Sequence, residues 1–414
     1  MTDAPVSRDA LGDSHNFGRR VTRKGDFVEK PRTVFWEELL LSAKSPLRRA
    51  LAEAAARDPI GKDALGFLPD LAVTTLPSGI GGRVRRIELA PLPAPSGRVT
   101  GGVAVAAGRA IAFFSWFGVA DLHWENLALG QAPDGGVVFA PLDVELVLGD
   151  FALPTETNLL PAADPELGEV YRHAAGIRRV LPWLGKPVRA ETVLALATAY
   201  LEMLAFLDRH ATALAEAVRR APGFRRAPIR VSLRGTEEYV RARSEPVFPP
   251  LLDAETEQLM RGDVPYFFRT YGRPGIRYYT APSLRRSDAL PSRGDVPRLP
   301  PLLSVERGLR SPSRRRLRTE GLLALLAAFD DRALDGTHVA PALRVAFRPR
   351  SLVVTLPNGE RLSSARNLRA FVGSVYLPCE CGEVRTPLVP AVTRCVPGRK
   401  GRARLRRRYS PRPS

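Results

Sequence analysis

An apolar stretch of eighteen residues, Val103–Ala120, most constrains how this chain can fold. Its length is marginal for crossing a bilayer, and Arg109 and two glycines interrupt it. A buried helix over Ala104–Gly118 is the better interpretation. The N-terminus has no apolar run of the kind found in secretory signals. We therefore expect a soluble, cytoplasmic protein without membrane insertion.

Composition places the chain among globular proteins. It has 414 residues, of which 44% are hydrophobic and 7% aromatic, so extensive disorder is excluded and two or three domains are expected. Three cysteines, Cys379, Cys381 and Cys395, are too few for a disulfide framework. They also lack a nearby fourth ligand for a structural zinc ion.

The net charge of +19 is unevenly distributed. The last eighteen residues, 397–414, contain eight basic residues and no acidic one, and a second basic cluster lies within 307–318. We interpret both as solvated basic segments, since neither has the interleaved aromatic residues that stack on bases. The alternative is an electrostatic site for an acidic peptide or a nucleic acid.

The pattern along the chain predicts an α+β protein in four parts. Residues 1–32 are polar and are expected to form a mobile N-terminal segment, and 33–310 the main domain. Residues 311–396 are expected to form a helix followed by a small β-rich C-terminal module, and 397–414 a basic tail.

Local signals predict individual elements. Thr33–Arg57 and Glu191–Arg219 have helical periodicity, with a break near Pro46 in the first segment. The turn sequence at 133–136 precedes an apolar strand. The Pro-Asn-Gly sequence within 341–374 lies between two alternating runs and predicts a hairpin.

Polar residues directly after the apolar stretch have the spacing of a phosphotransfer site. Phosphoryl transfer needs a carboxylate that orients the attacking hydroxyl, and an amide oxygen and a second carboxylate that hold Mg²⁺. In kinase-like folds the base Asp and the metal Asn lie five residues apart, as Asp121 and Asn126 do here. Asp143 follows the next apolar strand. The alternative is a surface helix start at Asp121, with His123 as an ordinary, partly buried histidine.

Five motifs follow one another along the chain. They are DLHWENLAL at 121–129, PLDVELVL at 141–148, NLLP at 158–161, IRVSLRGTEEY at 229–239 and RGDVPYF at 261–267. Together and in this order, they resemble the dehydratase domain of class II lanthipeptide (lantibiotic) synthetases. The resemblance covers roughly residues 35–310. Aminoglycoside-type kinases share the first motif but do not explain the last two.

The resemblance implies a kinase-like enzyme that uses ATP and Mg²⁺ to phosphorylate Ser and Thr of a ribosomally made precursor peptide (a RiPP). Matched by position, Asp121 is the phosphorylation base, and His123 belongs to the same loop. Asn126 and Asp143 match the residues that hold Mg²⁺ at the nucleotide, and Glu145 supports them.

The same resemblance implies a second step, in which phosphate is eliminated to leave a dehydroamino acid. Arg230 and Thr236 match family residues used in this step. The family's Asp-x-His pair, sought before the Gly-Gly-Arg strand, falls on Pro77 and Gly79. We therefore expect elimination to be impaired and the product to stall at the phosphopeptide. The zinc-binding cyclase domain of the family is absent, so a separate cyclase is an expected partner.

The family's phosphate-gripping lysine lies in a Tyr-Lys-Pro-Arg strand, and no lysine occurs between Lys62 and Lys186. The span from Gly81 to Asp121 is also short, so a reduced N-lobe is expected. Two alternatives to the enzyme remain. One is a catalytically degenerate relative that binds a precursor peptide or a partner. The other is a nucleic-acid-associated protein that uses the Arg-rich tail.

Overall fold

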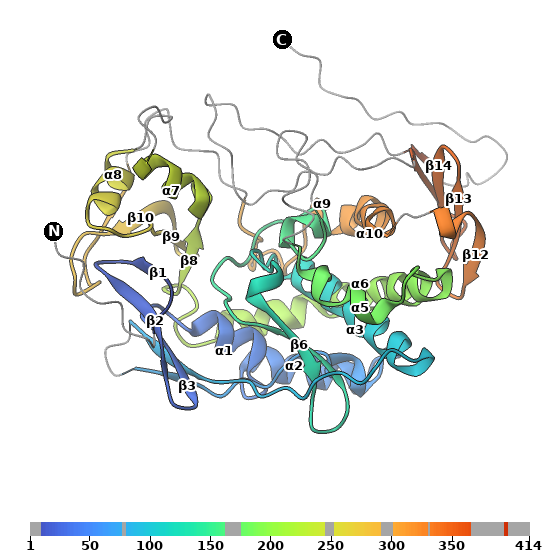
Figure 1. The fold of residues 1–414 in the computed structure, drawn as a ribbon, viewed down its shortest axis with the longest axis horizontal. Coiled ribbons are helices and arrows are strands. Elements are labelled where there is room, and N and C mark those ends of the chain that lie inside the picture. Colours follow the sequence, from blue (N-terminus) through green and yellow to red (C-terminus); the bar gives the residue numbers. More distant parts are fainter. Residues whose placement is uncertain are drawn as a thin grey trace, which may run out of the picture.

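The protein is described here by a computed structural model and has an α+β fold (Figure 1). Pro77, Gly79, Cys379, Cys381 and the basic tail, which the sequence analysis singled out, lie outside the described residues. The described residues are 10–76, 80–161, 175–244, 252–290, 301–329, 332–365 and 393–395.

An antiparallel sheet forms the N-terminal layer, with its strands in the order β1-β2-β3-β5-β4. Gly18 and Gly25 have positive φ at the tight turns that join the first three strands, a conformation that glycine adopts without strain. The strands are β1 (Ala10–His15), β2 (Arg19–Lys24), β3 (Phe27–Lys30), β4 (Val73–Thr75) and β5 (Gly82–Arg85).

The prediction of a mobile segment over 1–32 is therefore wrong for its described part. Three strands lie between Ala10 and Lys30, and β3 pairs with β5 from far along the chain. The short span from Gly81 to Asp121 supplies one strand of this sheet, β5, which pairs with both β3 and β4. Residues before Thr33 supply three further strands.

Two helices follow β3, and the predicted break between them is confirmed. Helix α1 (Phe35–Leu41) ends before helix α2 (Pro46–Ala55) begins. Ser45 caps α2, because its side-chain oxygen accepts a hydrogen bond from the backbone N–H of Arg48 at 3.0 Å. Pro46 takes the first helical position, where its missing N–H costs nothing.

Two long helices form the centre of the molecule. Helices α3 (Gly97–Trp116) and α6 (Ala190–Arg220) contact each other along their lengths, which confirms both helices expected from the sequence. Each is long and apolar enough to cross a bilayer, but 67% of its most apolar window is buried inside the protein. That burial is typical of core helices in a soluble protein. A short helix, α5 (Leu181–Leu184), packs beside α3.

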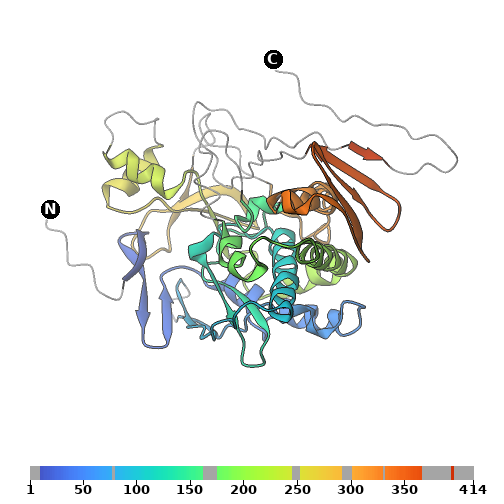
Figure 2. The ribbon, with the colours of Figure 1, turned by 45° about the vertical axis from the view of Figure 1, so that its right-hand side comes forward.

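A second sheet lies at one end of this helical centre (Figures 1 and 2). Its strands have the order β11-β10-β9-β8. The second sheet and its helices are β8 (Pro228–Val231), α7 (Thr236–Ser244), α8 (Asp253–Met260), β9 (Phe267–Thr270), β10 (Arg273–Tyr279) and β11 (Ser287–Ala289).

A separate hairpin follows α3. It is formed by β6 (Leu127–Gln131) and β7 (Val137–Pro141), as the turn sequence predicted.

A third sheet lies at the opposite end of the helical centre (Figures 1 and 2). The predicted hairpin around Pro-Asn-Gly is confirmed, since it joins β14 to β15. Val345 and Val354 are fully buried in the same core as α3 and α6. The elements are α9 (Pro312–Arg316), a π-helical turn (Leu317–Gly321), α10 (Leu322–Ala328), β12 (Gly336–Ala340), β13 (Leu343–Arg348), β14 (Ser351–Thr355), β15 (Arg361–Ala365) and β16 (Thr393–Cys395).

The close contact of the two central helices depends on Gly108 of α3. A Cβ atom at this position would lie 2.1 Å from the carbonyl oxygen of Leu196 on α6. We expect Gly108→Ala to lower the free energy of unfolding by roughly 1–3 kcal/mol, because the helices must separate. Gly102→Ala is the matched control, since nothing lies within 4 Å of its Cβ position, and it should stabilise by up to about 1 kcal/mol. Urea denaturation measures both values, and equal effects would contradict the prediction.

Candidate active site

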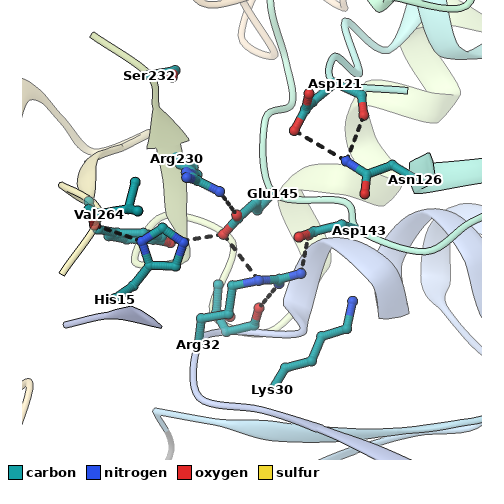
Figure 3. A network of polar contacts seen from close by, with 12 residues as sticks. His15, Lys30, Arg32, Asp121, Asn126, Asp143, Glu145, Arg230, Ser232 and Val264 are labelled. Atoms are coloured by element: carbon teal, nitrogen blue, oxygen red, sulfur yellow. Dashed lines mark hydrogen bonds and ion pairs between the residues drawn. The ribbon is translucent and has the colours of Figure 1, made fainter. Parts of the chain in front are cut away.

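The loop after α3 brings two of the predicted residues into contact. Asp121 has a positive φ of 63°, which is uncommon for a residue other than glycine and typical of functional sites. Its backbone N–H donates to the Oδ1 atom of Asn158 at 3.3 Å. The Nδ2 atom of Asn126 donates to the carbonyl oxygen of Asp121 at 3.0 Å and to its Oδ2 atom at 3.3 Å. The amide oxygen of Asn126 then points toward Asp143 (Figure 3).

His123 lies between these two residues and stabilises the loop. Its Nδ1 atom accepts a hydrogen bond from the backbone N–H of Glu125 at 3.3 Å and caps the short 3₁₀ turn Trp124–Asn126. Its Nε2 atom is 3.8 Å from Oδ1 of Asp121. The structure therefore places His123 in the same loop as Asp121, in a position to orient that carboxylate.

Arg32 connects three carboxylates on the facing wall of the site. It lies just after β3, is 8% exposed, and its Nη2 atom donates to Oδ1 of Asp143. Nη2 also donates to Oε1 of Glu37 at 2.8 Å, and Nε is 3.1 Å from Oε2 of Glu145. Burial acts to lower the pKa of Arg32, but Asp143, Glu37 and Glu145 outweigh it and raise the pKa well above its ordinary value.

Asp143 remains ionised for the converse reason. Burial acts to raise its pKa, but the positive charges of Arg32, Lys30 and Arg230 outweigh burial, and the pKa is lowered. Its side chain is 32% exposed, so solvent and small ligands reach it. Asp143 is thus an accessible anion held by a buried cation.

Lys30 is a site residue that the sequence analysis missed. It ends β3, and its Nζ atom contacts Oε1 of Glu37 at 3.0 Å and donates to the carbonyl oxygen of Leu142 at 2.5 Å. Lys30 and Glu37 are 5% and 1% exposed. The signal was present, because Lys30-Pro31-Arg32 has the Lys-Pro-Arg sequence that was sought after Lys62.

Glu145 joins this part of the site to the second sheet. Its Oε1 atom is 2.5 Å from Nη1 of Arg230, and its Oε2 atom accepts a hydrogen bond from the hydroxyl of Tyr266 at 3.2 Å. The carbonyl oxygen of Glu145 also accepts from the backbone N–H of Arg230 at 2.9 Å. With Arg32, this buried carboxylate therefore contacts two guanidinium groups (Figure 3). The guanidinium of Arg230 also lies 5.4 Å from the ring centre of Tyr266.

His15, at the end of β1, is the second residue that the sequence analysis missed. Its Nδ1 atom is 2.7 Å from the carbonyl oxygen of Val264, and its ring meets Tyr266 edge-on at 5.9 Å. Since a carbonyl oxygen only accepts, Nδ1 carries the hydrogen and Nε2 of the neutral ring keeps a lone pair. The ring faces the side where Glu145 and Arg230 meet (Figure 3). His15 ends the sequence Asp13-Ser14-His15, in which Asp13 is exposed and only His15 reaches the site, whereas an Asp-x-His pair was expected at Pro77 and Gly79.

The Gly-Asp-Val-Pro-Tyr-Phe motif positions His15. Asp263 of this motif is fully buried and accepts hydrogen bonds from the hydroxyl of Ser14 and the backbone N–H of Phe17, both at 2.7 Å. It also accepts from the N–H of Gly18 at 2.9 Å. The motif therefore fixes the β1–β2 turn against the second sheet.

The structure brings six of the seven predicted site residues to one region and places Thr236 apart. Thr236 begins α7 and is exposed. Within the described part of the chain, no hydrogen bond or ion pair joins it to Arg230 or Glu145. A role for Thr236 in elimination stays a prediction.

The described residues include no group of three or more His, Cys, Asp or Glu side chains that would hold a metal ion by themselves. Mg²⁺ is usually bound by one or two carboxylates together with substrate phosphates. The carboxylate of Asp143 and the amide oxygen of Asn126 fit that donor set. These two residues would bind Mg²⁺ with a nucleotide.

Comparison with protein-family models gave no match for this chain, and comparison with curated proteins gave none either. The functional interpretation therefore depends on the motifs and on the geometry of this site.

The pKa of His15 yields a test of the site's electrostatics. Burial lowers this pKa from 6.5, and the charge of Arg230 lowers it further, while the Val264 hydrogen bond, Glu145 and Asp13 act more weakly in the opposite direction. Between the lowered pKa of the folded state and 6.5, the unfolded chain therefore binds a proton that the folded chain does not, and the free energy of unfolding falls as the pH is lowered through this range.

We expect His15→Gln to reduce this loss, by up to about 1.4 kcal/mol for each pH unit over which the folded and unfolded states differ by one proton. Urea denaturation of both proteins between about pH 7.5 and pH 5 measures the effect. Identical pH dependence of the two proteins would show that His15 does not titrate as described.

Proposed function

We propose that the protein is a kinase-like, lanthipeptide-dehydratase-type enzyme of the cytoplasm. It phosphorylates Ser or Thr of a precursor peptide with ATP and Mg²⁺, then eliminates the phosphate. The observation that carries the proposal is the Lys30–Glu37 pair beside Asp143, with Asp121 and Asn126 on the facing loop.

The Lys30–Glu37 pair supports nucleotide binding. In protein kinases a strand lysine pairs with a glutamate of the following helix and contacts the nucleotide phosphates. Lys30 ends a strand and Glu37 lies in the helix that comes next, in the same order. Arg32 contacts the same oxygen of Glu37, so the glutamate keeps a cationic partner when Lys30 contacts a phosphate.

The loop supports transfer to a hydroxyl group. Asp121 would orient the substrate hydroxyl and accept its proton, and Asn126 and Asp143 would hold Mg²⁺. Arg32 contacts Oδ1 of Asp143, which leaves Oδ2 for the cation. Mg²⁺, when bound, neutralises charge on the phosphates during transfer.

The second half of the site supports elimination. A base removes the α-proton of the phosphorylated residue, its electron pair forms the Cα–Cβ double bond, and the Cβ–O bond breaks with its electrons leaving on phosphate. Neutral His15 has a lone pair on Nε2 for the proton, and Arg230 is a permanent cation for the phosphate. His15 would supply the base that was not found at Pro77 and Gly79, so we propose that the reaction proceeds to elimination, and the stalled phosphopeptide stays the alternative prediction.

Thermal unfolding with ATP and Mg²⁺ tests the first step. A ligand that binds only the folded state at about 100 times its dissociation constant adds roughly 2.7 kcal/mol of stability. We expect a Mg²⁺-dependent rise in melting temperature for the wild type. The rise should be lost in Asp143→Asn and weakened in Lys30→Met. Lys24→Met is the control, because that lysine is 61% exposed and pairs only with Glu29 among the described carboxylates. No shift in the wild type would favour the catalytically degenerate relative.

A synthetic peptide with one phosphoserine tests the second step separately. We expect the wild type to convert it to a dehydroalanine peptide, with a mass loss equal to phosphoric acid. His15→Asn should slow this conversion by about 10²–10⁴-fold, the usual effect of losing a general base. His338→Gln, in β12 of the third sheet, is the control. Thr236→Val tests the remaining predicted residue. A phosphopeptide left unchanged by the wild type would contradict the elimination step.

A further inference from the structure

A large groove lies outside the candidate active site. Its walls come from α1, α2 and α3, from the segment after β5 and from the turn between β6 and β7, and its volume is about 2080 Å³. Pockets for small molecules have volumes of about 300–1,000 Å³. The groove is therefore large enough for a segment of polypeptide. None of the active-site residues described above lines it.

Positive charges without ion-pair partners are the main property of this groove. Its walls carry eight lysine and arginine side chains and six aspartate and glutamate side chains. None of the eight cations forms an ion pair within 4.0 Å with a carboxylate of the described residues. Two of the carboxylates are already hydrogen-bonded, because Asp70 accepts from the N–H of Ala43 and Asp134 from that of Gly136.

Arg48 is a buried cation on the groove wall. It is 9% exposed, and its Nη1 atom donates to the carbonyl oxygens of Leu41 at 3.3 Å and Pro69 at 2.9 Å. Its Nε atom is buried and has no hydrogen-bond partner in the described part of the chain. Burial lowers the pKa of Arg48 to about 10, with Asp70 opposing that effect. An anion in the groove would relieve the cost of this buried charge.

Arg109 provides the second unsatisfied donor. It is the one charged residue in the apolar stretch Val103–Ala120, where a cation is unfavourable for core packing. It lines the groove. Its Nη1 atom donates to the carbonyl oxygen of Asp63 at 3.3 Å, while its Nε atom is buried without a partner among the described residues.

We propose that this groove binds an extended acidic segment of the precursor peptide, with carboxylates paired to Arg48 and Arg109. This inference rests on the proposed function and names where the non-reacting part of the substrate is held. Leu89, which is partly exposed, also lines the groove and would contact an apolar residue of the segment. A peptide fits better than a nucleic acid, because six wall carboxylates oppose a continuous polyanion but tolerate spaced negative charges.

Fluorescence anisotropy with a labelled peptide of alternating Glu and Leu tests the proposal. We expect binding that weakens with salt. Arg109→Leu and Arg48→Met should each raise the dissociation constant about tenfold, the effect of losing a charge-assisted hydrogen bond. Leucine is compatible with the apolar helix around position 109, so Arg109→Leu still tests the proposal if Arg48→Met does not fold. Arg57→Leu is the matched control, since Arg57 is exposed just beyond α2 and outside the groove.

Two further probes complete the experiment. A peptide with Lys in place of Glu should not bind. Equal affinities of wild type and both variants for the Glu peptide, or no binding, would overturn the proposal. The proposal would also be overturned if the wild type bound single-stranded oligo-dT more tightly than the Glu peptide and Arg109→Leu abolished that binding. If the Glu peptide does not bind but Mg-ATP still raises the melting temperature, only the groove proposal is refuted. Peptide binding without a nucleotide shift would refute the phosphotransfer function alone.

Discussion

The candidate site depends on one buried carboxylate, Glu145. It contacts Arg32, which follows β3, and Arg230 of β8, and it accepts a hydrogen bond from Tyr266 before β9. A carboxylate that is only 5% exposed would strongly destabilise the fold if it had no partners. Two guanidinium groups and a hydroxyl compensate it. Because buried ion pairs add little net stability but are costly to break, the main consequence is geometric. Glu145 holds the N-terminal sheet, the β7 loop and the second sheet in one arrangement.

The parts that were predictable from the sequence are those set by local pattern. The central helices α3 and α6 are long and apolar, so burial alone specifies them. Asp121 and Asn126 lie on one loop and make contact there, so their spacing in the sequence was enough to predict that they are neighbours. The hairpin that ends just before Asp143 was likewise predictable from its local turn sequence.

The parts that were missed come from the N-terminal strands. Strand β2 has the sequence RRVTRK and none of its residues is fully buried, so it lacks the apolar alternation that predicts a strand. Strand β2 forms because it pairs with β1 and β3. Strand β3 in turn pairs with β5, which lies more than fifty residues later in the chain. Lys30 and His15 therefore reach the site through long-range pairing. Lys30 precedes the stretch after Lys62 in which a phosphate-binding lysine was expected, because the sheet is built from two distant stretches of chain.

Charge balance explains how the site is arranged for anionic ligands. Three cations, Lys30, Arg32 and Arg230, face three carboxylates, Glu37, Asp143 and Glu145. The network is thus close to neutral without a ligand, and the buried charges are compensated in the folded protein.

The ion pair with Glu145 engages only Nη1 of Arg230. Burial acts to lower the pKa of Arg230, but Glu145 and the other neighbouring acidic groups raise it overall, so it remains charged at any working pH. In the proposed reaction, a phosphate formed on the Asp121 side would meet this cation already in place, beside the neutral His15. The two proposed steps would share Glu145 as their common support, so the phosphorylated residue would need to move only across this network between them.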